Sequence, residues 1–160
     1  MQEIDFRGRS LQTGEWVYGY YYEHQPPMQC KTSKDYVPEK PKSYILQTGF
    51  ADWNMPRPVD FIEVDPGTVG QCTGVKDCKR TVKYSKGQPI YVGDIVIVNY
   101  GLKDRKENII NEQNCKGYLA IIKFEDGMFT HGWCEPELNG ERLYVIGNIY
   151  DNPELLEVEE

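Results

Sequence analysis

The sequence predicts a mainly β fold with little helix: a small SH3-like barrel in the C-terminal half, with additional N-terminal strands. Short runs of alternating apolar and polar residues have the length and period of strands. The chain contains 12 tyrosines, a residue type that favours the half-buried surfaces of sheets. Turn residues separate the runs, and Asp126-Gly127 between two apolar runs indicates a tight hairpin.

Four extended segments are predicted in the N-terminal half. Gly19, inside the second of them, indicates a bulge or a close approach of another backbone segment. The fourth segment is expected to stop at Asp65-Pro66-Gly67, a turn sequence, before residues 68–73 continue extended. The four segments cover residues 3–7, 15–23, 43–48 and 59–64.

The C-terminal half contains five further predicted strands and one short helical turn. Gly93-Asp94 interrupts the clearest strand, as a sharp bend would. Residues 151–156 are expected to form the helical turn, with Asn152 as the cap and Pro153 as the first helical residue. The five strands lie around residues 80–84, 89–100, 117–125, 128–134 and 143–150.

Two domains follow from this pattern. Residues 1–74 form an N-terminal β unit with a proline-rich loop at about 24–42, and residues 75–160 form the SH3-like barrel. One continuous domain is the alternative. The loop contains four prolines and has no regular period, and loops of this length inside compact domains are usually functional or mobile.

Composition bears on the class of protein and on its compartment. The formal net charge of −7 disfavours non-specific binding to nucleic acid, although it leaves room for a local basic patch. No basic and apolar leader is visible at Met1, and no run reaches the roughly 18 apolar residues of a membrane span. The sequence therefore predicts a cytoplasmic protein that does not insert into a membrane, with its five cysteines reduced.

Three groups of segments share one family pattern: Ile4 to Gly8 with Trp16 to Gly19, Val64 to Asp77 with Pro89 to Val96, and Val145 to Leu156. Together they resemble the YopX family, small proteins encoded by phages and prophages of bacteria. Val75 and Val92 stand where the family pattern usually has leucine and glutamate, and the stretch from Cys78 to Gln88 is longer than usual. The resemblance implies a β-rich fold, an origin in a mobile element and self-assembly, and it offers no catalytic residues.

Few residues are candidates for catalysis or for binding a metal or cofactor. His131 and Cys134 have HxxC spacing and Cys72 lies near Cys78, but two tight ligand pairs of the kind that zinc prefers are missing. A Cys–His nucleophile would be recognised by geometry that the sequence does not supply. The glycine-containing turns match no phosphate-binding motif. No catalytic residue, metal ligand or cofactor is therefore predicted, and the protein is expected not to be an enzyme.

The tyrosine-rich segment is the candidate binding surface. Tyr18, Tyr20 and Tyr22 alternate along one predicted strand and so share one face, with Trp16 preceding them. Such a face most often packs against another layer or a partner subunit, where tyrosine and tryptophan are enriched. Stacking of nucleic-acid bases is the alternative, for which the local cations are Arg7, Arg9, Lys31, Lys34, Lys40 and Lys42.

These observations support two main functional hypotheses. The first is a non-enzymatic phage or prophage accessory protein, a protein-interaction or self-assembly module whose partner is a second copy or an unidentified host or phage protein. The alternative is a nucleic-acid-binding module that uses the SH3-like barrel, a hypothesis based on analogy of fold alone. A small hydrolase is a third class, which a deep pocket with converging Asp, His or Cys side chains would favour.

Overall fold

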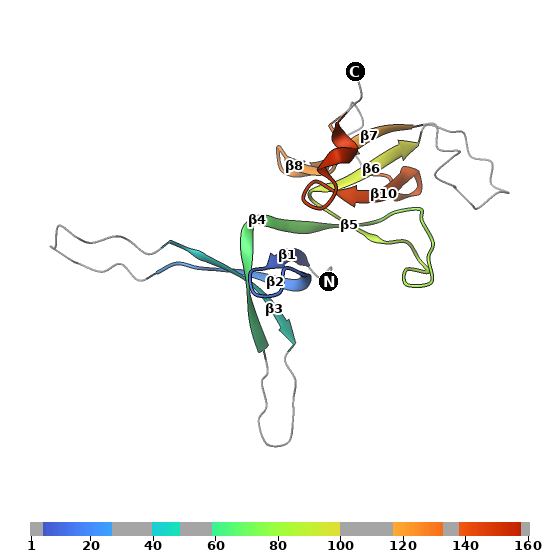
Figure 1. The fold of residues 1–160 in the computed structure, drawn as a ribbon. Helices are drawn as coiled ribbons and strands as arrows, with labels where there is room; N and C mark the ends of the chain where they lie inside the picture. The colour runs from blue at the N-terminus through green and yellow to red at the C-terminus, as the bar shows by residue number, and fades with distance from the viewer. Residues whose placement is uncertain (1–4, 27–39, 49–58, 100–116, 133–137, 158–160) are drawn as a thin grey trace. The chain divides into compact units, whose positions relative to one another are not determined.

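The structure is a computed structural model that describes residues 5–26, 40–48, 59–99, 117–132 and 138–157 (Figure 1). These residues form ten strands and two short 3-10 turns. The prediction of a mainly β chain with little helix is therefore confirmed. Most of the predicted proline-rich loop, the loop at 49–58 and the charged segment at 101–116 lie outside the described residues.

The described chain divides into two compact units, one ending at Gly70 and the other beginning at Gln71. The 18-residue strand β4 (Val59–Lys76) contributes residues to both units. The predicted domain boundary after residue 74, with an SH3-like barrel beyond it, stays a prediction.

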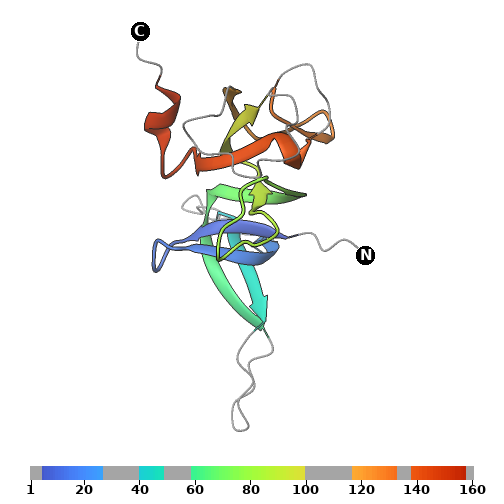
Figure 2. The same ribbon diagram turned by 90° about the vertical axis from the view of Figure 1, so that its right-hand side faces the viewer.

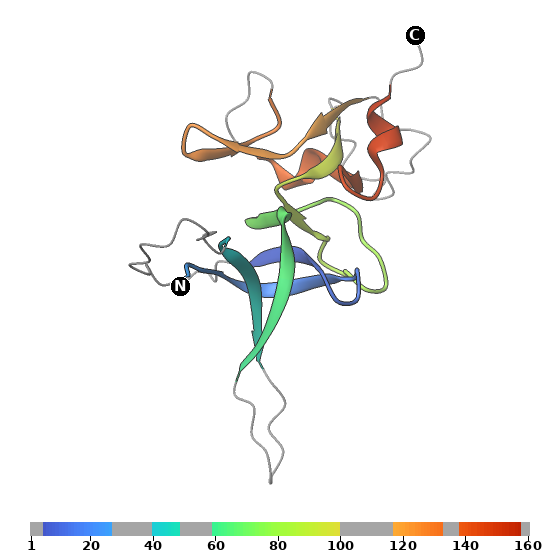
Figure 3. The ribbon, with the colours of Figure 1, turned by 60° about the vertical axis from the view of Figure 1, so that its left-hand side comes forward.

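The first unit is an antiparallel sheet in the order β1-β2-β3-β4. The blue strands β1 and β2 run side by side in Figure 2, and the cyan strand β3 follows β4 in Figure 3. Strand β1 also pairs with β4, so every strand of this set has two neighbours. The strands before β4 are β1 (Phe6–Ser10), β2 (Trp16–His24) and β3 (Lys42–Thr48).

Strand β4 corrects the expected end at Asp65-Pro66-Gly67. The turn chemistry is present, because the Gly67 N–H donates to Asp65 Oδ1 at 2.9 Å and the Thr68 hydroxyl donates to the Asp65 carbonyl at 2.7 Å. The strand nevertheless continues, since its pairing partner changes here. Val64 pairs with Ser43 of β3, whereas the Arg9 N–H of β1 donates to Thr68 Oγ1 at 2.9 Å.

The inner face of the first unit is built around two fully buried side chains, Ile45 and Val64. Ile45 pairs with Tyr21 on one side and with Ile62 on the other. A Cβ atom on Gly19 would overlap the carbonyl oxygen of Leu46. The predicted close backbone approach at Gly19 is therefore confirmed.

The second unit contains six shorter strands besides the end of β4. A three-stranded antiparallel sheet has the order β10-β6-β7, β8 and β9 form a separate hairpin, and β5 pairs with β4 through Tyr91 and Cys72. The strands are β5 (Pro89–Tyr91), β6 (Asp94–Asn99), β7 (Gly117–Ile121), β8 (Lys123–Glu125), β9 (Met128–Thr130) and β10 (Leu143–Asn148).

The core of the second unit is aliphatic. The predicted bend at Gly93-Asp94 is confirmed: Gly93 has a φ of +87°, and the buried Asp94 carboxylate accepts the Tyr91 N–H at 2.8 Å. This bend separates β5 from β6 and lets residues of both enter one core. The core consists of Ile90, Val96, Val98, Ala120, Ile122, Leu143 and Val145.

Three local predictions for this half are corrected. No strand forms at 80–84. Instead, the Thr81 N–H donates to the Tyr84 carbonyl and the Tyr84 N–H donates to the Thr81 hydroxyl, and these two bonds close a compact turn. The predicted strand 117–125 is split at Ile122. The helical turn exists as the 3-10 turn η3 (Pro153–Leu156), but the Asn152 side chain makes no capping bond and donates to Glu154 Oε1 at 3.3 Å.

Candidate binding face

Three tyrosines of β2 lie on an exposed face of the first unit. Tyr18, Tyr20 and Tyr22 are 44%, 59% and 42% exposed, whereas Tyr21 between them is half-buried and faces Ile45. The alternation in the sequence thus has the predicted consequence that the three side chains share a face. In the described part of the chain this face is open to solvent.

Strands β3 and β4 extend the tyrosine row into a two-dimensional patch. In the sheet register Tyr20 lies opposite Leu46, and Leu46 lies opposite Phe61, which is 59% exposed. We call this patch the aromatic face. Its members are Tyr18, Tyr20, Tyr22, Tyr44, Leu46, Val59 and Phe61.

Three rings of the aromatic face contact one another. Tyr22 stacks on Tyr44 with centroids 6.4 Å apart, and both rings meet Phe61 edge to face, at 6.3 and 6.2 Å. Offset and edge-to-face contacts at such separations are favourable. They join rings from β2, β3 and β4 into one cluster.

Trp16 lies on the same face of β2 as the three tyrosines but is less exposed than they are. It is half-buried, and the Arg7 guanidinium lies 4.9 Å from the centre of its ring. Arg7 itself is only 5% exposed, so this cation is turned away from solvent. Of the four predicted binding residues, the three tyrosines are therefore exposed together, whereas Trp16 is half-buried in contact with Arg7.

Two opposite charges balance each other at one end of the aromatic face. Lys42 and Glu63 lie at one end of it and form an ion pair with 3.4 Å between Nζ and Oε1. His24, opposite Lys42, shares a hydrogen bond of 3.3 Å between its Nδ1 and the Tyr22 hydroxyl. The two charges of this ion pair cancel and add no net charge to the face, whose centre is formed by exposed rings such as Tyr20 and Phe61.

Sequence reasoning missed four members of the face: Tyr44, Leu46, Val59 and Phe61. Their alternation within residues 43–48 and 59–64 was visible as a strand signal. The register between these strands decides which tyrosine each residue lies beside. Long connections separate the strands, and the sequence carries no direct signal for their register.

A pocket of about 370 Å³ lies beside the end of the face. Its ionisable groups are the paired Lys42 and Glu63 together with Lys40, and the hydroxyl of Ser43 in its lining shares a hydrogen bond of 3.1 Å with the Tyr21 hydroxyl. The pocket is lined by Leu11, Lys40, Pro41, Lys42, Ser43, Glu63, Val64 and Pro66.

The histidine and cysteine candidates are placed as follows. His131 is buried, and its Nδ1 lies 2.9 Å from the Tyr118 hydroxyl. Cys72 and Cys78 are half-buried, whereas Cys30, Cys115 and Cys134 lie outside the described residues. Within the described ranges, no three His, Cys, Asp or Glu side chains are grouped closely enough to hold a metal ion. None of the helices in these ranges is long and apolar enough to cross a membrane.

Asp77 is a buried carboxylate with a perturbed pKa. Desolvation by burial raises the pKa of this carboxyl group above 3.8, and backbone hydrogen bonds from Gln88 and Val145 oppose the shift. The N–H groups of these residues lie 2.7 and 3.2 Å from the carboxylate oxygens. Both oxygens are thus used to join backbone segments, which is a structural role.

Comparison with known proteins identifies the family. The family model described as YopX protein matches residues 5–157. No curated protein matches the chain. Among solved structures, the crystal structure of protein EF1440 from Enterococcus faecalis is similar, with 19% sequence identity and a TM-score of 0.47 over 98% of this chain and 100% of that one. The resemblance drawn from the sequence is confirmed, and the chain belongs to the YopX protein family.

Proposed function

We propose that this protein is a non-enzymatic phage or prophage accessory protein that associates with a second copy of itself through the aromatic face. The observation that carries the proposal is the set of exposed, mutually packed rings on β2, β3 and β4. Exposed apolar patches of this kind, with polar surroundings, are typical of interaction sites.

The area of the patch fits a weak dimer. Aromatic side chains offer about 150–250 Å² each, so the exposed fractions of the patch amount to roughly 500 Å² per copy. An isologous pair would bury on the order of 1,000 Å² in total, which is the lower limit for a specific interface. We therefore expect dissociation at micromolar concentration and a reversible dimer.

The charges of the face favour a second copy over a polyanion. Arg7, which lies opposite Tyr18 in the sheet register, is only 5% exposed, and the ion pair between Lys42 and Glu63 leaves the other end of the face without an excess of either sign. Two copies of the chain, each with a net charge of −7, can thus meet at this patch without placing like charges opposite each other there. Stacking of nucleic-acid bases would instead require uncompensated cations beside the rings.

The proposal includes the finer points of the sequence-based hypothesis. We place the protein in the cytoplasm, as its composition suggests, and in the life cycle of a phage or prophage, as its resemblance to the YopX family implies. We also propose that the second unit completes an SH3-like barrel. The antiparallel order β10-β6-β7 and the sharp bend at Gly93-Asp94 support that architecture.

Sedimentation equilibrium of the full chain, from low micromolar to several hundred micromolar protein, tests the proposal. We expect the average mass to rise from that of a monomer towards that of a dimer. The rise should persist at high salt, because the contact is apolar rather than ionic. A mass that stays monomeric throughout this range would rule out self-association.

A further inference from the structure

A dense cluster of cations lies in the connection between β4 and β5, far from the aromatic face in the sequence. Residues 76–86 contain four lysines and one arginine but only one acidic residue, Asp77. The chain as a whole has 18 basic and 25 acidic residues, so this stretch departs strongly from its surroundings. We call residues 76–88 the basic loop; it is the yellow-green loop before β5 in Figures 1 and 3.

The basic loop has a defined internal structure. At its base the Asp77 N–H donates to the Gln88 carbonyl at 2.9 Å, and the Gln88 N–H donates back to Asp77 Oδ1 at 2.7 Å. At its tip the Thr81 N–H donates to the Tyr84 carbonyl at 3.1 Å. The cations are therefore presented from an ordered turn, which reduces the entropy lost when a ligand binds.

The single acid of the loop is turned inward. Asp77 is 5% exposed, and both of its oxygens accept backbone N–H groups. Lys79 is also drawn in, with its ammonium group 4.6 Å from the centre of the Tyr144 ring. The solvent side of the loop is consequently positive.

Four cations point outward with an apolar tip among them. Lys76, Arg80, Lys83 and Lys86 are exposed, and none of them forms an ion pair with another residue in the described part of the chain. Val82, between Arg80 and Lys83, is fully exposed. An uncompensated cation cluster with this composition fits the closely spaced phosphates of nucleic acid.

We infer that the basic loop binds the phosphate backbone of double-stranded DNA without sequence preference. Duplex DNA has the higher charge density and rewards each cation more than a single strand does. Single-strand binding also needs open aromatic rings for stacking. Here the Tyr144 ring is 4% exposed, and the half-buried Tyr84 ring has the Lys83 ammonium 5.2 Å from its centre.

The four outward cations set the size of the expected effect. Neutralising about four phosphates gives a slope of log K against log salt of about −3 to −4. Affinity should therefore fall by roughly 100-fold when the salt concentration is raised about fourfold. The acidic remainder of the chain opposes binding, so we expect a dissociation constant in the micromolar range or weaker at physiological salt.

Fluorescence anisotropy of a labelled duplex, titrated with the full chain at several salt concentrations, tests this inference. Lys83→Gln should lower the magnitude of the salt slope by about 1, and the triple change Arg80→Gln, Lys83→Gln and Lys86→Gln by about 3. These side chains are exposed, so we expect the variants to fold.

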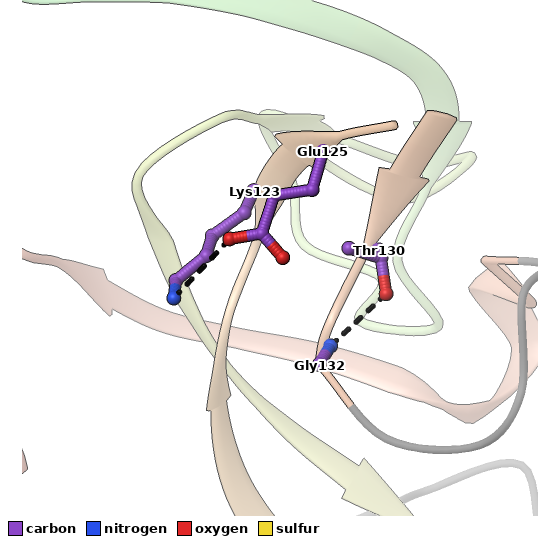
Figure 4. Close-up of polar contacts among 4 residues, drawn as sticks. All are labelled: Lys123, Glu125, Thr130 and Gly132. Atoms are coloured by element: carbon purple, nitrogen blue, oxygen red, sulfur yellow. Dashed lines mark hydrogen bonds and ion pairs between the residues drawn. The ribbon is translucent and has the colours of Figure 1, made fainter. Parts of the chain in front are cut away.

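Lys123→Gln is the matched control. Lys123 is exposed in the same unit, but its ammonium group is already compensated by Glu125 of the β8–β9 hairpin at 3.5 Å (Figure 4). This variant should retain the affinity and the slope of the parent. Equal losses for Lys83→Gln and Lys123→Gln would overturn the assignment to the loop.

Three other results would also overturn the inference. One is the absence of duplex binding at low salt, and another is binding without a salt slope. The third is tighter binding of a single strand of the same length, or displacement of the duplex by an equal charge concentration of polyglutamate. Retention of the parent slope by the triple variant would place the site elsewhere.

Discussion

The Asp77 carboxylate accepts a hydrogen bond of 3.2 Å from the amide N–H of Val145, a residue 68 positions further along the chain. Val145 belongs to the core of the second unit, and the other oxygen of Asp77 holds Gln88 at 2.7 Å. One carboxylate therefore attaches the base of the basic loop to β10. Protonation of the Asp77 carboxylate and its replacement should both change the stability of the protein measurably.

Asp77→Asn should destabilise the protein. An amide side chain offers one oxygen instead of two, so at least one of the backbone N–H groups that bind the Asp77 carboxylate loses its acceptor. Leaving a buried donor unsatisfied costs about 1–3 kcal/mol. Urea denaturation at neutral pH measures the effect. Asp126→Asn, in the exposed β8–β9 turn, is the control and should change stability by less than about 0.5 kcal/mol.

The contribution of Asp77 to stability should fall as the pH rises. Because burial raises its pKa above 3.8 in the folded chain, the folded state retains this proton at pH values where the unfolded chain has released it. The advantage of the wild type over Asp77→Asn is then largest below pH 3.8 and decreases as the pH rises through the folded pKa. An advantage that grew with pH across this window would contradict a raised pKa.

Changes to the aromatic face should weaken self-association without unfolding the chain. Tyr20→Ala and Phe61→Ala each remove a ring that is 59% exposed. Each change occurs on both sides of an isologous contact, so we expect at least a tenfold rise in the dissociation constant, or about 1.4 kcal/mol. Sedimentation equilibrium measures it.

The control for the aromatic face is Leu11→Ala, which removes an apolar side chain that is 62% exposed and lies outside the face. It should leave the dissociation constant unchanged. If Leu11→Ala weakened association as strongly as Phe61→Ala, the contact would have to lie elsewhere on the first unit.

Local sequence patterns predicted most of the strands, but they did not predict which residues of neighbouring strands pair. The alternation of Tyr18, Tyr20 and Tyr22 predicted a shared face, because the period of a strand is a local property. That Phe61 completes this face depends on the register of β3 and β4. Register is set by long-range packing against buried residues such as Ile45, which a local pattern does not reveal.

The second feature that the sequence predicted only in part was where strands begin and end at turn residues. Asp65-Pro66-Gly67 makes the expected local hydrogen bonds, yet β4 continues because a second neighbour, β1, takes over the pairing. Residues 80–84 were expected to be a strand, whereas local bonds between Thr81 and Tyr84 form a turn. The grouping of outward cations in the basic loop follows from that turn and was therefore missed.

Gly19→Ala should be strongly destabilising. A Cβ atom at this position would overlap the carbonyl oxygen of Leu46, so β2 and β3 would have to separate locally. Overpacking of this kind costs about 1–3 kcal/mol. Gly67→Ala is the matched control, because its Cβ would lie 3.3 Å from the side chain of Asp65, which is exposed and can move. Equal midpoints of urea denaturation for the two variants would contradict the close approach at Gly19.

Tyr118→Phe should destabilise the second unit by removing the hydroxyl partner of a buried histidine. The hydroxyl lies 2.9 Å from His131 Nδ1, and the two rings also meet edge to face with centroids 5.9 Å apart. The ring contact survives in phenylalanine, so the loss is that of one hydrogen bond to a buried group, about 1–3 kcal/mol. Tyr84→Phe is the control, since its hydroxyl has no hydrogen-bond partner in the described part of the chain. Urea denaturation should place Tyr118→Phe clearly below Tyr84→Phe in stability, and indistinguishable values would show that the hydroxyl of Tyr118 contributes nothing to the fold.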